Sequence, residues 1–253
     1  HRQRIEGLCR RAKIRYADIV YWPIFGGRMI TAGVMGLIPR FRYIMVTDAL
    51  LQLLSPNEID QVIAHEIGHV RYKHLILYLL FFIGFMLISY SVFPISSYLL
   101  ITKPFIHFIF YYSLDIERIY TISSSVLLVI CAIIYFRYLF GYFMRNFERQ
   151  ADIHVFELFP SAQPLIKTFV KIVAASGQSA DKPNWHHFSI QQRIDYLTLC
   201  EKSAPWIMRH HRKVKKSIMI YLIGFLLLSL SAYQFTQMVY SGGAQYISVE
   251  DLE

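Results

Sequence analysis

Cysteine is scarce in this chain. Its three cysteines, Cys9, Cys131 and Cys200, form none of the short spacings that are typical of a disulfide framework or a cysteine-ligated metal site. We therefore expect reduced, structural thiols. Charged residues are also few, at 17% of the chain, against about 25% in soluble domains. The composition thus argues against a small secreted scaffold and against an ordinary soluble domain.

Three uninterrupted apolar runs account for this composition, in which 55% of the residues are hydrophobic. Residues 75–93, 121–143 and 217–238 each have the length that a transmembrane helix needs. The single charge in the second run, Arg137, lies towards one end, where a long side chain reaches the lipid headgroups. Soluble helices of this length are seldom so evenly apolar, so we predict three membrane spans and a lipid bilayer as a partner.

The basic residues are unevenly distributed. Residues 1–74 hold 11 and residues 144–216 hold 12, whereas residues 75–143 hold 3 and residues 217–253 hold none. By the positive-inside rule both basic segments belong on the cytoplasmic side. We therefore predict one cytoplasmic domain in two parts, interrupted by a transmembrane hairpin with an external loop and followed by a third transmembrane helix with an external tail.

The net charge of +9 does not indicate a nucleic-acid partner. The densest basic run, residues 209–216, directly precedes the third apolar run, which favours a lipid-facing anchor. No nucleic-acid-binding motif accompanies it, so we predict no nucleic acid. The chain begins at His1 without an initiator methionine and shows no signal peptide, and we expect a fragment or processed product with segments missing before His1 or after Glu253.

The sequence His-Glu-Ile-Gly-His at residues 65–69 is the motif that carries chemistry. Two histidines four residues apart on a helix face the same way and can bind one zinc ion. Glu66, between them, is then placed to take a proton from a water that attacks a carbonyl. The motif therefore predicts a zinc peptidase.

A capping box predicts the helix that carries this motif, with Ser55 at the N-cap, Pro56 at the first helical position and Glu58 three residues after the cap. Gln61 is expected to be exposed. An apolar stripe for packing follows, namely Ile59, Val62, Ile63 and Ile67. Histidines outside the motif have no partner pattern and are expected at the surface: His74, His154, His186 and His210.

A catalytic zinc site needs a third protein ligand. Glu148 and Asp152 are four residues apart, so on a helix one can bind the metal while the other hydrogen-bonds a ligand histidine. Alternatively the pair forms a solvated acidic face in which Glu148 pairs with Arg145 or Arg149. The first motif favours the metal site.

These residues resemble the integral-membrane zinc endopeptidases that include the CAAX prenyl protease and the heat-shock protease HtpX, a family of gluzincins. The family's H-E-x-x-H matches His65 to His69, and its E-x-x-A-D matches Glu148 to Asp152. The resemblance implies one Zn²⁺ per chain, ligated by His65, His69 and Glu148. It further implies Glu66 as the base and Asp152 as the partner of a ligand histidine.

Two further elements extend the resemblance. His187, followed six residues later by Arg193 and Ile194, matches residues that lie in the family's cleft, where they would stabilise the oxyanion or hold substrate. Phe188 departs from the family, in which a proline usually follows the histidine. The other element resembles the edge strand on which an extended peptide docks, and comprises Thr31, Ala32, Gly33 and Val34.

We therefore predict an α+β, mainly helical fold, with a zincin-like catalytic domain and a small antiparallel sheet over about residues 18–47. The predicted function is a membrane-embedded zinc-dependent metalloendopeptidase that hydrolyses polypeptides, especially membrane or misfolded proteins. We expect it in the bacterial inner membrane, with its active site on the cytoplasmic side. The sequence predicts no particular oligomeric state.

Two alternatives remain at this point. One is a non-catalytic zinc-containing membrane scaffold or chaperone-like peptide binder, against which the intact Glu66 argues because a structural site needs no base. The other is a protease that cuts within the bilayer. The motif helix of such an enzyme would be apolar, whereas Glu58, Asp60, Arg71 and Lys73 flank the motif here.

Overall fold

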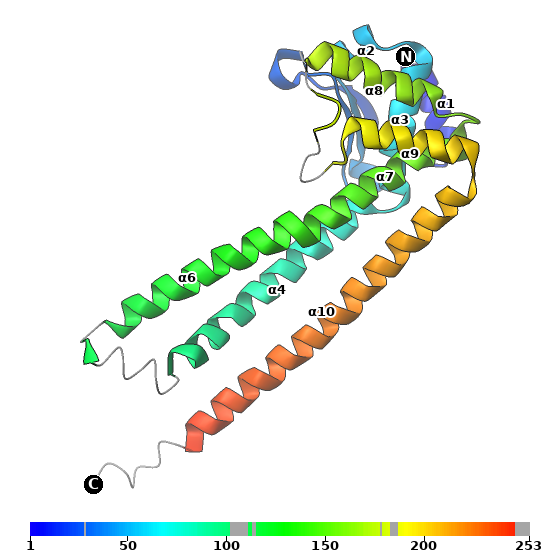
Figure 1. Ribbon diagram of the computed structural model, residues 1–253. Helices are drawn as coiled ribbons and strands as arrows, with labels where there is room; N and C mark the ends of the chain where they lie inside the picture. Colours follow the sequence, from blue (N-terminus) through cyan, green and yellow to red (C-terminus); the bar gives the residue numbers. More distant parts are fainter. Residues whose placement is uncertain (28, 102–110, 113–114, 178, 183–186, 246–253) are drawn as a thin grey trace, which may run out of the picture. The chain divides into compact units, whose positions relative to one another are not determined.

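The structure is a computed structural model that describes residues 1–253 except 28, 102–110, 113–114, 178, 183–186 and 246–253. It consists of two compact units (Figure 1). The mixed unit, which contains the sheet, comprises His1–Leu79 and Phe140–Lys215. The three-helix unit comprises Leu80–Leu139 and Lys216–Glu253.

The mixed unit contains most of the secondary-structure elements. Two short 3-10 turns, Ile24–Gly27 and Pro39–Phe41, flank its second strand. In chain order its complete helices and strands are α1 (Arg2–Arg11), β1 (Asp18–Tyr21), β2 (Ala32–Met35), β3 (Tyr43–Val46), α2 (Asp48–Leu53), α3 (Pro56–Arg71), α7 (Gly141–Leu158), α8 (Gln163–Ser176) and α9 (Ile190–Lys202).

The sheet has the strand order β1-β3-β2. β2 and β3 pair antiparallel, with Ala32 opposite Val46, as predicted. β1 and β3 pair parallel, with Asp18 opposite Tyr43, so the sheet is mixed rather than wholly antiparallel. The physical reason is that β1 and β2 run in opposite directions, so β3, which lies between them, can be antiparallel to only one of them. The α+β, mainly helical class is confirmed, and β2 is left at an edge of the sheet.

The motif helix α3 begins as predicted. The backbone N–H of Ser55 donates to Oε2 of Glu58 at 2.7 Å, which forms one half of the capping box. Ile59, Ile63 and Ile67 are fully buried in the core. The expectation for Gln61 is wrong: its side chain is buried, donates to the carbonyl of Ser161 at 2.6 Å and accepts from the N–H of Leu165 at 2.9 Å, because α8 covers that face.

Helices α3 and α7 approach each other closely at Gly68. A Cβ atom at this position would lie 3.0 Å from the Cα of Ala151 and 3.0 Å from the Cβ of His154. Only glycine leaves room for this approach, and Ala151 is itself fully buried. The contact places the histidines of α3 beside the carboxylates of α7.

The three-helix unit contains parts of α4 (His74–Ile101) and α10 (Pro205–Gln245), together with α6 (Ile116–Ile134). A π-helical turn, Tyr135–Phe140, follows α6. Within this unit the hydroxyl of Tyr135 donates to the carbonyl of Phe81 at 2.7 Å and lies 3.0 Å from the hydroxyl of Tyr221. This cluster joins all three helices.

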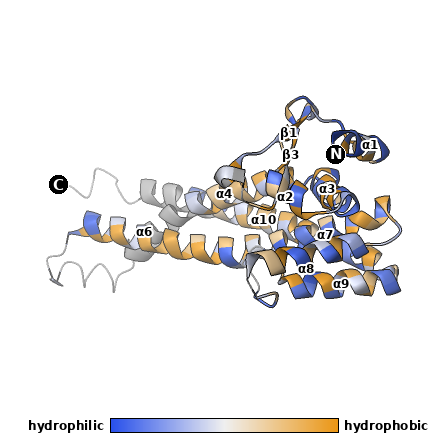
Figure 2. Ribbon diagram, turned by 90° about the horizontal axis from the view of Figure 1, so that it is seen from above, coloured by the Kyte–Doolittle hydropathy of each residue, from blue (hydrophilic) through white to orange (hydrophobic). Residues whose placement is uncertain are grey.

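Two helical segments, Ile116–Leu158 and Pro205–Gln234, are long and apolar enough to cross a membrane. A third, His74–Tyr90, meets the same criterion when it is joined to α3 across the break between them. Apolar residues run along α6 in Figure 2. The apolar runs predicted at residues 121–143 and 217–238 begin within the first two segments.

Candidate metal centre

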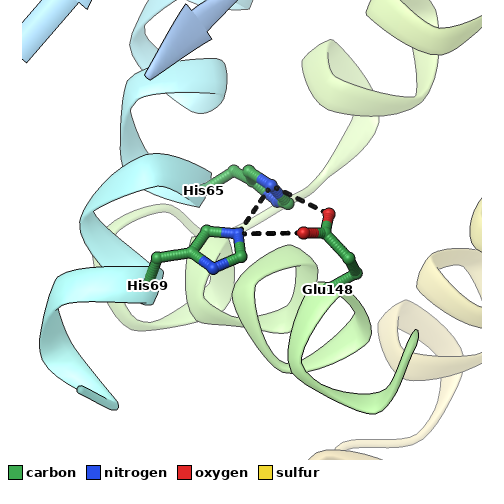
Figure 3. A group of neighbouring side chains, drawn as sticks. All are labelled: His65, His69 and Glu148. Carbon is green, nitrogen blue, oxygen red and sulfur yellow. Dashed lines mark hydrogen bonds and ion pairs between the residues drawn. The ribbon is translucent and has the colours of Figure 1, made fainter. Parts of the chain in front are cut away.

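His65 and His69 on α3 and Glu148 on α7 point towards one another (Figure 3). The Nε2 atoms of the two histidines are 3.3 Å apart. Oε2 of Glu148 lies 3.6 Å from Nε2 of His65, and Oε1 lies 3.4 Å from Nε2 of His69. Glu148 is buried, so the alternative of a solvated acidic face does not describe it.

This cluster fits a divalent metal ion. Zinc bound by imidazole nitrogens at about 2.0–2.1 Å in tetrahedral geometry has neighbouring ligand atoms roughly 3.3 Å apart. The separations of 3.3, 3.4 and 3.6 Å agree with that spacing. Two neutral imidazoles also cannot place bare Nε2 lone pairs this close without a proton or a cation to compensate. The donor set and its spacing therefore suit a metal.

The ionisation states of His69 and Glu148 also suit metal binding. Burial lowers the pKa of His69 to about 4, so its ring is neutral at pH 7. Burial by itself would raise the pKa of Glu148, but a hydrogen bond to His187 and electrostatic interactions with the His69 and His65 rings hold that pKa well below its usual range. A neutral imidazole and an ionised carboxylate are the forms that coordinate metals.

Asp152 occupies the position expected of a partner to a ligand histidine. Its Oδ1 lies 2.9 Å from Nδ1 of His65, which directs Nε2 of that ring towards the metal position. Arg193 on α9 binds the same carboxylate through two hydrogen bonds of 2.8 and 2.6 Å. Burial opposes ionisation of Asp152, but the charge of Arg193 and these hydrogen bonds lower its pKa to about 2.

His187 also reaches the cluster. Its Nδ1 lies 3.3 Å from Oε2 of Glu148, and about a third of its side chain, 37%, is exposed. The next residue is Phe188. The guanidinium carbon of Arg149 lies 3.8 Å from the centroid of the Phe188 ring and 4.2 Å from the centroid of the Tyr196 ring. Phe188 thus fixes the chain beside His187 to α7 without the proline that is usual in the family.

A cavity of 630 Å³ lies over the candidate metal centre. Glu66 and the two histidines of α3 line it, and so do the four residues of the predicted docking strand, Thr31, Ala32, Gly33 and Val34. Apolar side chains also line it, among them Val62, Leu165, Phe169 and Ile172. The edge strand β2 and the candidate ligands therefore line the same cavity.

Glu66 has the acidity of a general base. Burial raises its pKa to about 7, and a hydrogen bond with the backbone of Val34 opposes part of that rise. A base works best when its pKa is near the working pH, because it then both accepts and returns a proton readily. Glu66 therefore lies in the cavity beside the candidate ligands, with a carboxyl that can take up a proton near neutral pH.

Sequence reasoning missed the surroundings of His69. His74 is fully buried and its Nδ1 lies 3.0 Å from Nδ1 of His69, so the expectation that it is a surface residue is wrong. The same expectation is wrong for His154 and His210, which are also buried, and His186 lies outside the described residues. The spacing of five residues from His69 gives no helical signal, because α3 ends before His74.

Comparison with known proteins identifies relatives of the chain. The profile of peptidase family M48 matches residues 2–201. A protein described as "Protease HtpX homolog" from Thermoplasma acidophilum is 33% identical over 144 residues, which are 54% of this chain and 39% of that relative. The match therefore covers well under half of the relative's length. No solved structure gives a significant match.

Proposed function

Because the chain belongs to peptidase family M48, we propose that it is a membrane-embedded zinc-dependent metalloendopeptidase that cleaves extended segments of protein substrates. The observation that carries this proposal is the convergence of His65, Glu66, His69 and Glu148 on one cavity beside a sheet edge. A structural metal site would require neither a base beside the ligands nor a docking strand.

Substrate binding is assigned to β2. This strand pairs with β3 on one side only, so its other edge can add an extended peptide by main-chain hydrogen bonds. Val34 and Gly33 line the cavity next to Glu66. The apolar wall formed by Leu165 and Phe169 would receive a hydrophobic side chain of the bound peptide.

The chemistry is assigned to Glu66. Zinc held by His65, His69 and Glu148 would polarise the scissile carbonyl and acidify a water. Glu66 takes a proton from the attacking water as the water oxygen bonds to the carbonyl carbon. The electron pair of the carbonyl π bond moves onto the carbonyl oxygen. Glu66 then passes the proton to the leaving nitrogen as the carbon–nitrogen bond breaks, which restores the carboxylate.

We assign to His187 and Arg193 the stabilisation of the negative charge that develops on the carbonyl oxygen of the substrate. Both line the cavity, and His187 lies against Glu148 at the edge of the metal position. Arg193 also orients His65 indirectly, because it binds Asp152. Donors placed in advance around a forming oxyanion stabilise the transition state more than the ground state.

The membrane setting supports a role in quality control of membrane or misfolded proteins. Every member of the site lies in the mixed unit, and the long apolar segments lie largely in the three-helix unit. The basic residues are concentrated in segments 1–74 and 144–216, which form most of the mixed unit. By the positive-inside rule the active site faces the cytoplasm, and we place the protein in a bacterial inner membrane.

The proposal is tested with the full chain in detergent, loaded with one equivalent of zinc and given a permanently unfolded protein as substrate. We expect cleavage that stops on addition of a chelator and in Glu66→Gln, while Glu66→Gln keeps its zinc. Glu117→Gln, which changes an exposed carboxylate far along the chain, serves as the matched control and should cleave normally.

Either of two results would overturn the proposal that this protein is a peptidase. One is cleavage by Glu66→Gln at the wild-type rate, which would show that another protein causes the turnover. The other is stoichiometric zinc binding and peptide binding with no cleavage by the wild-type chain. The second result would favour the non-catalytic scaffold or chaperone-like binder.

A further inference from the structure

A buried row of polar side chains leads away from His69. Nδ1 of His69 lies 3.0 Å from Nδ1 of His74, the first residue of α4. Nε2 of His74 lies 3.2 Å from Oε1 of Gln150 on α7, and Nε2 of Gln150 lies 2.8 Å from Nδ1 of His211 on α10. All four residues belong to the mixed unit.

The amide of Gln150 determines where the protons lie. Its oxygen can only accept, so Nε2 of His74 carries a hydrogen, and in a neutral ring Nδ1 then has a lone pair. That lone pair accepts the Nδ1–H of His69. Nε2 of His69 is consequently the unprotonated nitrogen, and it is the atom that faces Glu148 and His65.

We propose that His74 and Gln150 are positioning residues that hold His69 in the tautomer and ring orientation required for metal binding. The proposal rests on the metal site of the proposed function. It gives His69 the counterpart of what Asp152 supplies to His65, namely a fixed partner for Nδ1. His69 would thus be oriented by a neutral relay rather than by a carboxylate.

Core packing alone does not account for which atoms in this row donate hydrogen bonds and which accept them. If the amide of Gln150 were reversed, its N–H would donate to Nε2 of His74, and Nδ1 of His74 would carry the hydrogen. Nδ1 of His69 would then be the acceptor, and a hydrogen on its Nε2 would occupy the metal position. The two amide orientations therefore correspond to a metal-binding and a non-binding state of His69.

Two neighbours stabilise the metal-binding orientation. His211 accepts the hydrogen bond from Nε2 of Gln150 and so keeps Oε1 turned towards His74. The ring of Phe147 stacks on the ring of His74, with centroids 4.5 Å apart and planes inclined by 8°. His211 lies in the first part of α10, which belongs to the mixed unit, so this part of the helix contributes to the geometry of the proposed metal site.

The test measures the zinc dissociation constant of the full chain in detergent by competition with a chromophoric chelator. Gln150→Leu and His74→Phe remove the relay, and we expect about 10- to 100-fold weaker zinc binding, as for other partners of ligand histidines. Gln150→Glu retains an acceptor for His74 and should bind zinc nearly as tightly as the wild type. At saturating zinc the kcat of these variants should largely recover, because Glu66 is untouched.

Gln61→Leu is the matched control. Gln61 is another buried glutamine with two hydrogen bonds, but it contacts Ser161 and Leu165 rather than a ligand. This variant should lose stability and keep its zinc affinity. If Gln150→Leu fails to fold, His211→Leu removes the acceptor from a half-buried position and should also weaken zinc binding.

The proposal is overturned if Gln150→Leu and His74→Phe bind zinc as tightly as the wild type, or if Gln61→Leu weakens binding equally. These outcomes are distinct from failure of the proposed function. That failure shows in the wild-type chain, which would then bind no zinc or cleave no substrate.

Discussion

Arg193 donates two hydrogen bonds to the carboxylate of Asp152, one from Nε at 2.8 Å and one from Nη2 at 2.6 Å. The same carboxylate lies 2.9 Å from Nδ1 of His65. The resemblance to the peptidase family implied that Arg193 acts on the oxyanion or the substrate. The structure shows in addition that Arg193 pairs with the acid beside His65, which joins α9 to the candidate metal centre.

Removal of Arg193 should therefore be costly. Arg193→Leu leaves Asp152 buried without its cation, and breaking a buried pair in this way costs about 3–5 kcal/mol. The measurement is chemical unfolding in detergent. The double variant Arg193→Leu/Asp152→Asn has no unpaired charge and should recover part of the loss. Equal stability of the single variant and the wild type would contradict this account.

Gly68 should be sensitive to substitution. In Gly68→Ala the new Cβ meets Ala151 and His154 at 3.0 Å, so α3 and α7 must separate and the histidines move away from Glu148. We expect a loss of about 1–3 kcal/mol together with weaker zinc binding. Unfolding and chelator competition measure both effects.

The control for Gly68 is Gly7→Ala on α1, where the added Cβ has one neighbour, the end of the Arg10 side chain at 3.9 Å. It should be neutral or stabilising by up to about 1 kcal/mol, since alanine favours helix over glycine. If both substitutions had the same effect, the close approach of α3 to α7 would not be important.

Glu58 should make stability depend on pH. Burial raises its pKa, but hydrogen bonds from Lys171 and Ser55 outweigh burial, so the pKa lies below the usual value. A carboxyl whose pKa falls on folding stabilises the fold above its unfolded pKa of about 4.3, and this stabilisation is lost as the pH drops through the folded pKa.

The measurement is the difference in melting temperature between the wild type and Glu58→Gln as a function of pH. We expect a clear difference at pH 7 that narrows as the pH falls below about 5. Asp181→Asn, at an exposed position, serves as the control and should show little difference at any pH. If the melting-temperature difference between the wild type and Glu58→Gln did not change with pH, the charge of the Glu58 carboxylate would not be what stabilises the fold.

Gly84 should matter to the three-helix unit. A Cβ atom there would overlap the hydroxyl of Tyr221, which lies in the cluster with Tyr135. Gly84→Ala should therefore separate α4 from α10 and lower the melting temperature in detergent. Gly224→Ala, whose Cβ would meet nothing within 4 Å, is the matched control and should be tolerated. Equal melting temperatures for the two variants would show that the tyrosine cluster does not hold the helices together.

Local spacing predicted most of the metal site. His65 and His69 are four residues apart on one helix, and Glu148 and Asp152 are four apart on another, so each pair had to share a helix face. Membership of the peptidase family, inferred from these two motifs, is confirmed. The capping box at Ser55 is likewise a local feature, and it forms as predicted.

Long-range packing could not be predicted in the same way. Gln61 was expected to be exposed because only its own helix was visible in the sequence, whereas α8 covers it. The parallel pairing of β1 with β3 depends on the order in which the strands join the sheet. No local pattern encodes either feature.

The sequence by itself determined the family and the candidate site residues, because helical periodicity and apolar run length are properties of neighbouring residues. It indicated a metal-binding motif, a base between the ligands and long apolar helices. Only the tertiary structure decided which side chains surround the candidate ligands, since Arg193 and His74 reach Asp152 and His69 across contacts between separate helices. Such contacts depend on how α7, α9 and the start of α4 pack around α3, and packing is a property of the whole fold.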